Sequence, residues 1–326
     1  MELLLIGMSR FARRRVLPAA SAMNEIEAIN IASSHADPAT VGPLPKLGQI
    51  YADWRAALQA NAPGLVYVSL VNSEHAQAVR YAIEQGHHVV VDKPAFLTLD
   101  TAEEMVSLAR SSSRVLAEAT CYSFHPMFAE VRSIVDGLDT DVTKVVAVFT
   151  PPVPADDFRH DRGRGGGALL DTGPYLASLG RVLWGAEPEQ VQAIVGDRTA
   201  DGLETSYSVL AGYPGGKTIV GQFGFTTTYR NSLLLLGRQL SVDLERPFSA
   251  LPDMTVGIQI ESHGQRHVRH VGPADSMRIF LSSVVDAVHD NSRAFDAPLL
   301  SDARTLDRLV RAASNGQEDG PVVVLG

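Results

Sequence analysis

Hydrophobic and polar positions alternate in a repeating order along the first third of the chain. Short apolar runs, which are typical of buried strands, occupy residues 3–6, 28–32, 65–70, 89–91 and 114–117. Between these runs, apolar residues recur every three or four positions, as in amphipathic helices, over residues 11–22, 53–59, 73–85 and 98–110. Strands that alternate with helices predict a parallel sheet with right-handed crossovers.

From residue 142 onward, the pattern is mostly that of strands. Strands are expected at residues 144–149, 191–195, 205–211, 218–225, 232–236 and 240–244, and residues 168–183 have a helical composition. Because proline is best tolerated in the first turn of a helix, Pro174 predicts that this helix begins near Gly173. Consecutive strands after an alternating first half predict an α+β domain with a large mixed or antiparallel open sheet.

This change of pattern predicts two domains with a boundary near Glu118. Residues 1–118 would form an α/β Rossmann domain that binds a dinucleotide, and residues 119–326 a domain for substrate binding and oligomerisation. A helix near Leu306 could pack back on the first domain, and a last strand is expected at residues 322–325. The chain of 326 residues is long enough for both domains.

Composition and charge narrow the class of protein. Hydrophobic residues make up 45% and charged residues 20% of the chain, as in soluble globular proteins. The net charge of −9 argues against nucleic-acid binding, including binding through the arginines at 13–15. Cys121 is the only cysteine, which excludes an intramolecular disulfide and suits a reducing cytoplasm, where we expect the protein. No stretch approaches the roughly 18 apolar residues of a membrane span, and the apolar run at residues 3–6 is too short for a signal peptide.

A glycine turn joins the first expected strand to the first helix. The sequence Gly7-Met8-Ser9-Arg10-Phe11-Ala12 resembles the dinucleotide-binding fingerprint, which would have glycine at positions 7, 9 and 12. Alanine is accepted at the third of these positions, whereas Ser9 adds a side chain where the backbone approaches the pyrophosphate. We expect Gly7, Ser9, Arg10 and Phe11 to contact a dinucleotide.

The end of the second strand normally distinguishes NAD from NADP. An acid at this point binds the ribose diol, and a base accommodates a 2′-phosphate. The strand here leads into Ser33-Ser34-His35, with no acid directly at its end. This slightly favours NADP, with Ser34, His35 and Arg10 as candidate contacts, although all three could be ordinary loop residues.

An acid, a base and a proline follow the run of valines at residues 89–91. Proline cannot continue a central strand, so Asp92 and Lys93 are delivered to the carboxyl end of the strand. In an open parallel sheet, ligands bind at that end. Taken alone, a solvated lysine at a strand end is the simpler interpretation, and the neighbouring motifs favour a functional one.

The second domain contributes a second group of polar residues. Three glycines at residues 165–167 allow a tight loop before the helix, and Asp171 and Tyr175 lie four apart on one helical face. A packing tyrosine is the alternative for Tyr175. The charged loop at residues 156–164 could cover an active site or could be an ordinary solvated loop.

Three histidines in a probable hairpin suggest a metal site only weakly. His263, His267 and His270 surround the turn at Gly264, and no carboxylate lies at ligand spacing. We therefore expect no metal.

Four segments together resemble the glucose–fructose oxidoreductase / inositol dehydrogenase family, also called Gfo/Idh/MocA. They are residues 6–12, residues 71–75 (the family's Pro-Asn-x-x-His), residues 92–94 (its Glu-Lys-Pro) and residues 165–175 (its Gly-Gly-Gly-x-x-x-Asp-x-Gly-x-His). The resemblance covers nearly the whole chain. It implies a Rossmann domain followed by a larger domain whose open sheet binds substrate and often forms an oligomer, here a homodimer or homotetramer.

The resemblance also assigns roles to individual residues. It implies that Leu70, Asn72, His75 and Asp92 lie near the cofactor, and that Lys93 lies between the nicotinamide and the substrate. Asp171 would bind substrate or orient its neighbour, and Tyr175 takes the place of the proton-relay residue. The chain departs from the family at Ser9 (glycine), Ser123 (often arginine) and Ser178 (often an acid).

The predicted activity is NAD(P)-dependent hydride transfer to or from a sugar or sugar-nucleotide carbonyl. A tyrosine hydroxyl can protonate the alkoxide formed on reduction, and a nearby lysine stabilises the developing charge. Within the family, Tyr175 and the helix start at residues 12–18 look most like those of the sugar 3-ketoreductases of deoxysugar pathways. The alternatives are a polyol or free-sugar dehydrogenase and a cofactor-binding regulatory protein that has lost catalysis.

Overall fold

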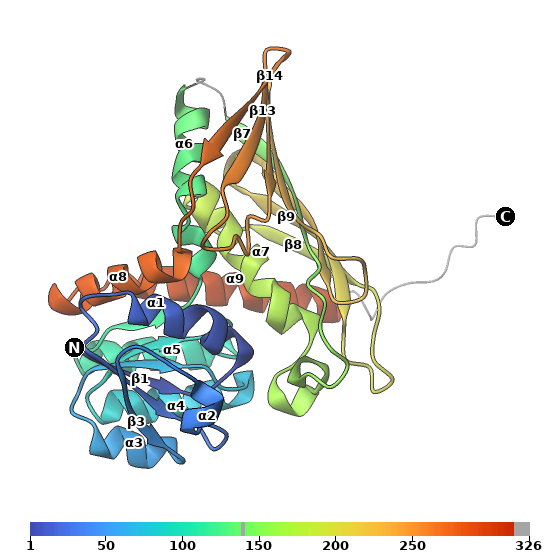
Figure 1. Ribbon diagram of the computed structural model, residues 1–326. Coiled ribbons are helices and arrows are strands. Elements are labelled where there is room, and N and C mark those ends of the chain that lie inside the picture. The colour runs from blue at the N-terminus through green and yellow to red at the C-terminus, as the bar shows by residue number, and fades with distance from the viewer. Residues whose placement is uncertain (138–140, 316–326) are drawn as a thin grey trace.

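The computed structural model describes residues 1–137 and 141–315, which build two sheets with helices packed on them (Figure 1). The first sheet is formed near the N-terminus and the second by the later strands, and helices α8 and α9 lie where the two parts meet. The chain is therefore organised around two sheets, as the change of hydrophobic pattern predicts.

The first sheet has six strands, and all of its strand pairs are parallel. The strands are β1 (Glu2–Ile6), β2 (Ala28–Ala32), β3 (Leu47–Tyr51), β4 (Leu65–Val68), β5 (His88–Val91) and β6 (Leu116–Glu118). Their order, β3-β2-β1-β4-β5-β6, is that of a doubly wound Rossmann sheet, in which the direction of winding reverses between β1 and β4. The predicted α/β architecture is confirmed.

Helices connect these strands, and the helices expected in this part of the chain are present. They are η1 (a π-helical stretch, Ala12–Val16), α1 (Leu17–Ser21), α2 (Pro38–Val41), α3 (Trp54–Ala60), η2 (a 3-10 turn, Asn72–Glu74), α4 (His75–Glu84) and α5 (Leu99–Ser111). Strand β3 was not predicted. It lies at the edge of the sheet, is nowhere fully buried, and its Leu-Gly-Gln-Ile-Tyr sequence lacks the apolar run of an inner strand.

The second sheet has eight strands in the order β14-β13-β12-β11-β7-β10-β9-β8. They are β7 (Val142–Phe149), β8 (Gln190–Val195), β9 (Ser206–Tyr213), β10 (Lys217–Gly224), β11 (Asn231–Gly237), β12 (Leu240–Glu245), β13 (Val256–Ser262) and β14 (Gln265–Val271). Only the pairing of β7 with β10 is parallel, so the sheet is mixed, as expected. The turn at Gly215 and the hairpin around Gly264 are also confirmed.

Helices cover one face of the second sheet, and the C-terminal helices also pack against the first part of the molecule. They are η3 (Cys121–Phe124), α6 (Pro126–Gly137), η4 (Phe158–His160), η5 (Arg162–Arg164), α7 (Ala168–Trp184), η6 (Pro214–Gly216), α8 (Ser276–His289) and α9 (Asp296–Asn315). Helix α6 was not predicted, although its buried residues Met127, Phe128, Val131 and Ile134 recur at helical spacing.

Helix α7 corrects the prediction drawn from Pro174. The helix begins at Ala168 and runs through the proline to Trp184. Burial of the residues on either side of Pro174 outweighs the cost of a proline within the helix. Gly173 lies against the side chains of Leu306 and Leu309 of α9, and a Cβ there would lie 2.7 Å from Leu306. Packing against α9 therefore keeps the segment helical.

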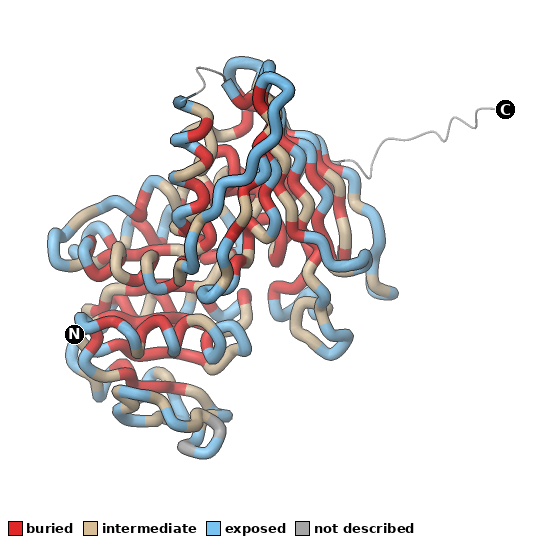
Figure 2. Tube along the Cα trace, turned by 45° about the horizontal axis from the view of Figure 1, so that its top comes forward, coloured by how far each residue is buried: buried red, intermediate tan, exposed pale blue. Residues whose placement is uncertain are grey.

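The last part of the chain packs on both sheets. Met277, Phe280 and Val284 of α8 are fully buried in the same core as Leu3 and Leu5 of β1. Helix α9 packs against α5 and β6 of the first part and against α7 of the second. The expected return of the C-terminal helix to the first domain is thus seen, and Figure 2 shows the buried positions running through both sheets. The strand expected at 322–325 lies outside the described residues.

The outer face of the second sheet carries a row of exposed apolar side chains. Val146 of β7, Val220 of β10 and Leu210 of β9 are 40%, 48% and 44% exposed. Val220 lies opposite Val146 on one side and Leu210 on the other, and Leu234 of β11 extends the row beyond Val146. No helix of the described residues covers this face (Figure 1).

Candidate active site

The loop after β1 lies at the switch point of the Rossmann sheet. Gly7 has a φ of +88°, and a Cβ at this position would lie 2.3 Å from the carbonyl oxygen of Ser69. Glycine alone tolerates both conditions. The N–H of Gly7 donates to the carbonyl of Ala32 at 2.9 Å, which places the loop beside the end of β2. This loop therefore has the close-packed backbone that a dinucleotide-binding turn requires.

Ser9, where the fingerprint would have glycine, has two structural partners. Its hydroxyl accepts the N–H of Ala12 at 2.9 Å and so caps the first helix. The same hydroxyl lies 2.7 Å from that of Ser69, which donates to Asp92 at 2.5 Å. Because Ser69 has a single proton, Ser9 is the donor to Ser69. The departure from glycine is thus used to cap the helix and to connect it to the end of β4.

Asp92 belongs to the same hydrogen-bond network. Its carboxylate accepts the hydroxyl of Tyr67 at 2.6 Å and that of Ser69 at 2.5 Å. Tyr67 is fully buried, and burial raises the pKa of its phenol. The negative charge of Asp92 raises this pKa further. The network fixes the end of β5, from which Lys93 extends.

Lys93 reaches from the first sheet to helix α7 of the second part. Its ammonium donates to the carboxylate of Asp171 at 2.8 Å and to the carbonyl oxygen of Asp171 at 2.5 Å. The same nitrogen lies over the ring of Tyr175, 5.1 Å from the ring centroid. The structure thus brings together Lys93, Asp171 and Tyr175, the three residues that the sequence proposed as catalytic.

A second cation, Arg159, completes the pairing of Asp171. Its Nε donates to the carboxylate of Asp171 at 2.8 Å, and its Nη1 donates to the carboxylate of Asp157 at 2.9 Å. The sequence marked the charged loop that carries Arg159 but did not single out this residue. The signal that could have found it is the buried acid at 171, which requires cations, although several cations of the loop competed for the role.

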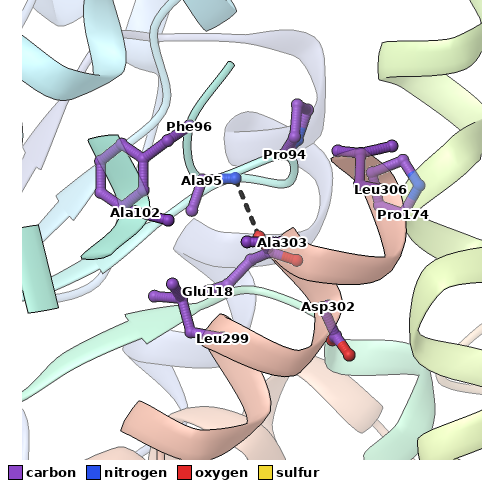
Figure 3. Close-up of a pocket in the computed structure, with 10 residues that line it drawn as sticks. All are labelled: Pro94, Ala95, Phe96, Ala102, Glu118, Pro174, Leu299, Asp302, Ala303 and Leu306. Carbon is purple, nitrogen blue, oxygen red and sulfur yellow. Dashed lines mark hydrogen bonds between the residues drawn. The ribbon is translucent and has the colours of Figure 1, made fainter. Parts of the chain in front are cut away.

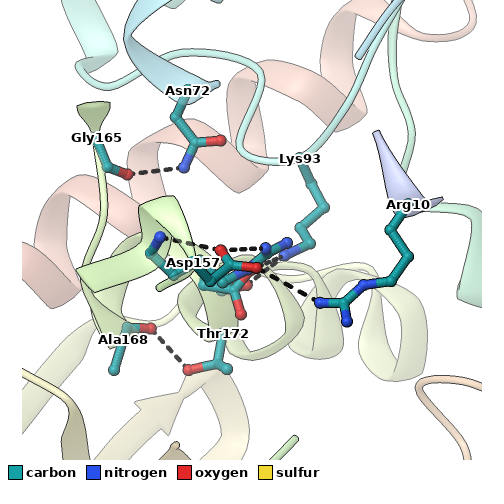
Figure 4. Close-up of polar contacts among 9 residues, drawn as sticks. Arg10, Asn72, Lys93, Asp157, Gly165, Ala168 and Thr172 are labelled. Atoms are coloured by element: carbon teal, nitrogen blue, oxygen red, sulfur yellow. Dashed lines mark hydrogen bonds and ion pairs between the residues drawn. The ribbon is translucent and has the colours of Figure 1, made fainter. Parts of the chain in front are cut away.

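An ion-pair chain crosses between the two parts of the molecule (Figure 4). Arg10, in the loop after β1, pairs with Asp157 at 3.4 Å. Asp157 pairs with Arg159, Arg159 with Asp171, and Asp171 with Lys93. Arg10 therefore pairs with the segment before the three glycines, and Lys93 pairs with helix α7 after them.

The charges around Asp171 determine its protonation. Burial by itself would raise the pKa of the Asp171 carboxyl, but Lys93 and Arg159 outweigh it and hold this pKa well below its usual range. Burial raises the pKa of the Tyr175 phenol well above its ordinary value, and the negative charge of Asp171 raises it further. At neutral pH the site therefore presents an ionised carboxylate beside a protonated phenol.

Aromatic rings surround Tyr175. Its ring centroid lies 4.6 Å from that of Phe149, 5.4 Å from that of Phe248 and 5.7 Å from that of Tyr122. The hydroxyl of Tyr122 lies 2.7 Å from that of Ser178, at the position where the family often has an acid. Ser178 is thus a hydrogen-bond partner of the aromatic wall around Tyr175.

Asn72 and His75 lie where the two parts of the molecule meet, and each has hydrogen-bond partners within the protein. The amide of Asn72 donates to the carbonyl of Gly165 at 2.8 Å. His75 is fully buried, with its ring nitrogens 3.0 Å and 3.1 Å from the carbonyl oxygens of Pro94 and Leu70. We propose that His75 positions the two loops that carry Leu70 and Lys93 and makes no direct contact with a ligand.

The remaining predicted cofactor contacts lie along the same edge. Ser34 and His35 follow β2 and are exposed, and Phe11 is 37% exposed beside the glycine turn. Leu70 is half-buried, and its side chain lies against the position that a Cβ of Gly7 would occupy. Their contact with a cofactor stays a prediction that this arrangement allows.

A half-buried acid that the sequence did not mark as a site residue supports the loop after Lys93. Glu118, at the end of β6, accepts the N–H of Ala95 at 2.9 Å and the hydroxyl of Thr120 at 3.0 Å (Figure 3). Burial, and then the charge of Asp302, raise the pKa of Glu118 to about 7. Asp302 itself forms a two-point ion pair with Arg181, at 2.6 and 2.8 Å.

Metal-binding clusters and membrane-spanning helices are two further features that would indicate a function. Within residues 1–137 and 141–315, no group of three or more histidine, cysteine, aspartate or glutamate side chains is arranged to hold a metal ion. His267 and His270 lie on the exposed strand β14, and His263 in the turn before it. No helix in the described part of the chain is long and apolar enough to cross a membrane.

Comparison with known proteins agrees with this architecture. Residues 1–120 match the oxidoreductase family with an NAD-binding Rossmann fold, and residues 128–243 match the GFO/IDH/MocA C-terminal domain. The fold and these matches define an oxidoreductase that uses a nicotinamide dinucleotide. The chain belongs to the GFO/IDH/MocA family, which confirms the resemblance seen in its motifs.

Several relatives carry named activities. The chain is 32% identical to a dTDP-3,4-didehydro-2,6-dideoxy-alpha-D-glucose 3-reductase of Streptomyces violaceoruber, over 74% of this chain and 72% of that protein. It is 26% identical to a D-xylose 1-dehydrogenase (NADP(+)) of Haloferax volcanii, over 96% and 97%. The crystal structure of KijD10, a 3-ketoreductase from Actinomadura kijaniata in complex with NADP and TDP-benzene, superposes with a TM-score of 0.89 at 25% identity, over 96% and 97%.

Proposed function

We propose that this protein is an NADP-dependent reductase of a keto sugar, carried as a sugar nucleotide, with Tyr175 as proton donor and Lys93 assisting. The observation that carries the proposal is the position of the Lys93 ammonium. It lies at the end of β5, paired with Asp171 at 2.8 Å and 5.1 Å from the ring centroid of Tyr175. A cation and a phenol thus meet at the edge of the Rossmann sheet where ligands bind.

The first loop fits a dinucleotide. Gly7 allows a dinucleotide to approach the backbone closely. The hydroxyl of Ser9 is hydrogen-bonded to the N–H of Ala12 and the hydroxyl of Ser69, so this side chain points toward the protein. Gly7, Ser9, Arg10 and Phe11 would hold the pyrophosphate end, with Leu70, Asn72 and Asp92 toward the nicotinamide. When bound, the dinucleotide would supply or accept the hydride.

Protons would move at the Tyr175 hydroxyl. The raised pKa of Tyr175 keeps the phenol protonated at neutral pH, so it can donate to a carbonyl oxygen as charge develops there. The ammonium of Lys93 stabilises the oxygen anion, and Asp171 keeps this ammonium in place. Oxidation of the corresponding alcohol would use the same groups in reverse.

The preference for NADP rests on local residues and on relatives. Ser34 and His35 are exposed at the end of β2, and no acid stands directly at that strand end. The D-xylose dehydrogenase relative is named for NADP, and KijD10 was crystallised with NADP. Together these observations favour NADP over NAD for this chain.

A homo-oligomer is proposed through the outer face of the second sheet. Val146, Val220 and Leu210 form a continuous apolar row with Leu234 across four neighbouring strands. An identical face on a second copy would cover it, which is also what the family resemblance implies.

The alternative with a specific observation in its favour is oxidation of a free sugar, because the D-xylose 1-dehydrogenase relative aligns over 96% of this chain. The idea of a protein that has lost catalysis is weakened by the structure. Ser9 and Ser178, two of the departures that suggested it, both have hydrogen-bond partners in the framework of the site.

The test is cofactor binding followed by turnover. NADPH and NADH are titrated separately into the protein while nicotinamide fluorescence is recorded, and keto-sugar nucleotides and free sugars are then screened by nicotinamide absorbance. We expect NADPH to bind more tightly than NADH and a keto-sugar nucleotide to be reduced, with Lys93→Ala binding NADPH but losing turnover. Failure of both cofactors to bind would remove the dehydrogenase proposal.

A further inference from the structure

The end of the second sheet nearest the first part of the molecule carries an arginine without a carboxylate partner. Arg246 follows β12, and its guanidinium carbon lies 5.7 Å from the ring centroid of Tyr229. No carboxylate among residues 1–137 and 141–315 forms an ion pair with Arg246, and its Nε is buried without a hydrogen-bond partner. Arg10 and Arg159, by contrast, both have carboxylate partners. The guanidinium of Arg246 is therefore available to bind an anion.

The backbone holds Arg246 in a specific conformation. Its φ is +57°, which is unusual for a residue other than glycine and is retained where the surroundings impose it. The N–H of Arg246 donates to the carbonyl of Asn231 at 2.7 Å, and the N–H of Phe248 donates to the side-chain oxygen of Asn231 at 3.2 Å. Two hydrogen bonds to Asn231 of β11 therefore hold the turn that carries Arg246.

The same asparagine fixes Tyr229. The buried amide of Asn231 donates to the hydroxyl of Tyr229 at 3.3 Å and to that of Ser249 at 2.8 Å. Tyr229 nevertheless remains 38% exposed. A rigid, exposed aromatic ring beside an arginine can stack a nucleobase while the guanidinium binds phosphate.

This cluster adjoins the proposed catalytic residues. Phe248, two residues after Arg246, has its ring 5.4 Å from the ring centroid of Tyr175. The following turn is tied to the Rossmann part, because Arg15 donates to the carbonyl of Ala250 at 3.2 Å. A ligand whose sugar reached Tyr175 could therefore extend past Phe248 to Arg246 and Tyr229.

We propose that Arg246 and Tyr229 form the site for the nucleoside diphosphate part of the substrate, with Arg246 on the pyrophosphate and Tyr229 stacked on the base. This inference rests on the proposed function, since it places the two residues relative to the sugar at Tyr175. It commits the chain to a nucleoside-diphosphate-linked sugar rather than a free sugar.

The test is a calorimetric titration of dTDP, and separately UDP, into the full chain with and without NADPH. We expect at least one of the two to bind, and Arg246→Gln to weaken that binding about tenfold, the loss of one charge-assisted contact. Tyr229→Ala is expected to weaken it by about the same factor through lost stacking. Arg266→Gln is the matched control, because Arg266 is 84% exposed on β14 and its ion pair in the described part of the chain is with Glu261. It should bind like the wild type.

The kinetic readout separates binding from folding or catalysis. With the sugar nucleotide that is turned over, Arg246→Gln should raise KM about tenfold and leave kcat within a factor of two, as expected for loss of uniform binding. The proposal is overturned if neither nucleotide binds to protein that binds NADPH and turns over a free sugar. It is equally overturned if Arg246→Gln binds the nucleotide as tightly as the wild type. Loss of NADPH binding, by contrast, would remove the dehydrogenase proposal and leave the nucleotide titration as a separate result.

Discussion

The ion pairs of Asp171 should stabilise the fold and depend on pH in a defined way. The carboxylate is 11% exposed and has two cationic partners, Lys93 at 2.8 Å and Arg159 at 2.8 Å. Asp171→Asn keeps the shape of the side chain but leaves Lys93 without its anion and Arg159 with Asp157 alone. Removing one partner of a buried ion pair typically costs about 3–5 kcal/mol, and partial exposure of the cations places our expectation at about 3 kcal/mol at pH 7.

The pH dependence follows from the direction of the pKa shift. The pKa of Asp171 is lower in the folded than in the unfolded chain, so its stabilisation is fully present above the unfolded pKa of about 4. Below that value the stabilisation declines as pH falls toward the folded pKa. The difference in free energy of unfolding between wild type and Asp171→Asn should therefore narrow by about 1.4 kcal/mol for each pH unit below about pH 4.

The assay is urea unfolding of both proteins at pH 7 and at two values between pH 3 and pH 4. Glu261→Gln is the matched control, because it breaks the exposed pair with Arg266, in which the side chains are 44% and 84% exposed. This variant should change stability by less than about 0.5 kcal/mol at every pH. An Asp171→Asn effect as small as that of the control, or one that does not narrow with acid, would refute the reasoning.

Three further outcomes follow from single features of the structure. Gly7→Ala should abolish measurable NADPH binding in a fluorescence titration and lower stability to urea, because the new Cβ would lie 2.3 Å from the carbonyl of Ser69; retained binding would contradict this. Wild-type stability to urea should fall by roughly 2 kcal/mol between pH 5 and pH 8, because the Glu118 pKa, raised to about 7, favours the protonated folded state at lower pH, and Glu118→Gln should lack this fall. Val220→Glu should convert the oligomer to a monomer in light scattering, whereas a wild-type protein that is already monomeric would remove the proposed interface.

Most of the fold followed from local patterns that tertiary packing reinforces. The alternation of apolar runs and amphipathic segments predicted the parallel sheet of the first part, because inner strands that are buried on both faces read as continuous apolar runs. Prediction failed where packing outweighed local preference. Strand β3 is an edge strand with few apolar residues, and α7 continues through Pro174 because Gly173 is packed against α9.

The candidate site could be predicted in its members but not in their partners. Lys93 and the pair Asp171 and Tyr175 are marked by strand-end and helix spacing, and the structure places them in contact. The partnership of Arg159 with Asp171 depends on how a charged loop folds, which no periodicity encodes. In the sequence, Glu118 is likewise an ordinary acid at a strand end, and its hydrogen bond with the N–H of Ala95 depends on the folded structure.

The central claim is tested most directly by the turnover of a single variant, Tyr175→Phe. The assay follows NADPH oxidation with the keto-sugar nucleotide that the wild type reduces, after confirming by fluorescence that the variant binds NADPH as the wild type does. Tyr213→Phe is the control, because its buried hydroxyl has no hydrogen-bond partner among the residues that the structure describes and its ring packs on Trp184 at the far end of α7. Loss of a general acid predicts a fall in kcat of about 10²- to 10⁴-fold for Tyr175→Phe and little change for the control. A Tyr175→Phe protein with wild-type kcat would contradict the proposed role of this residue.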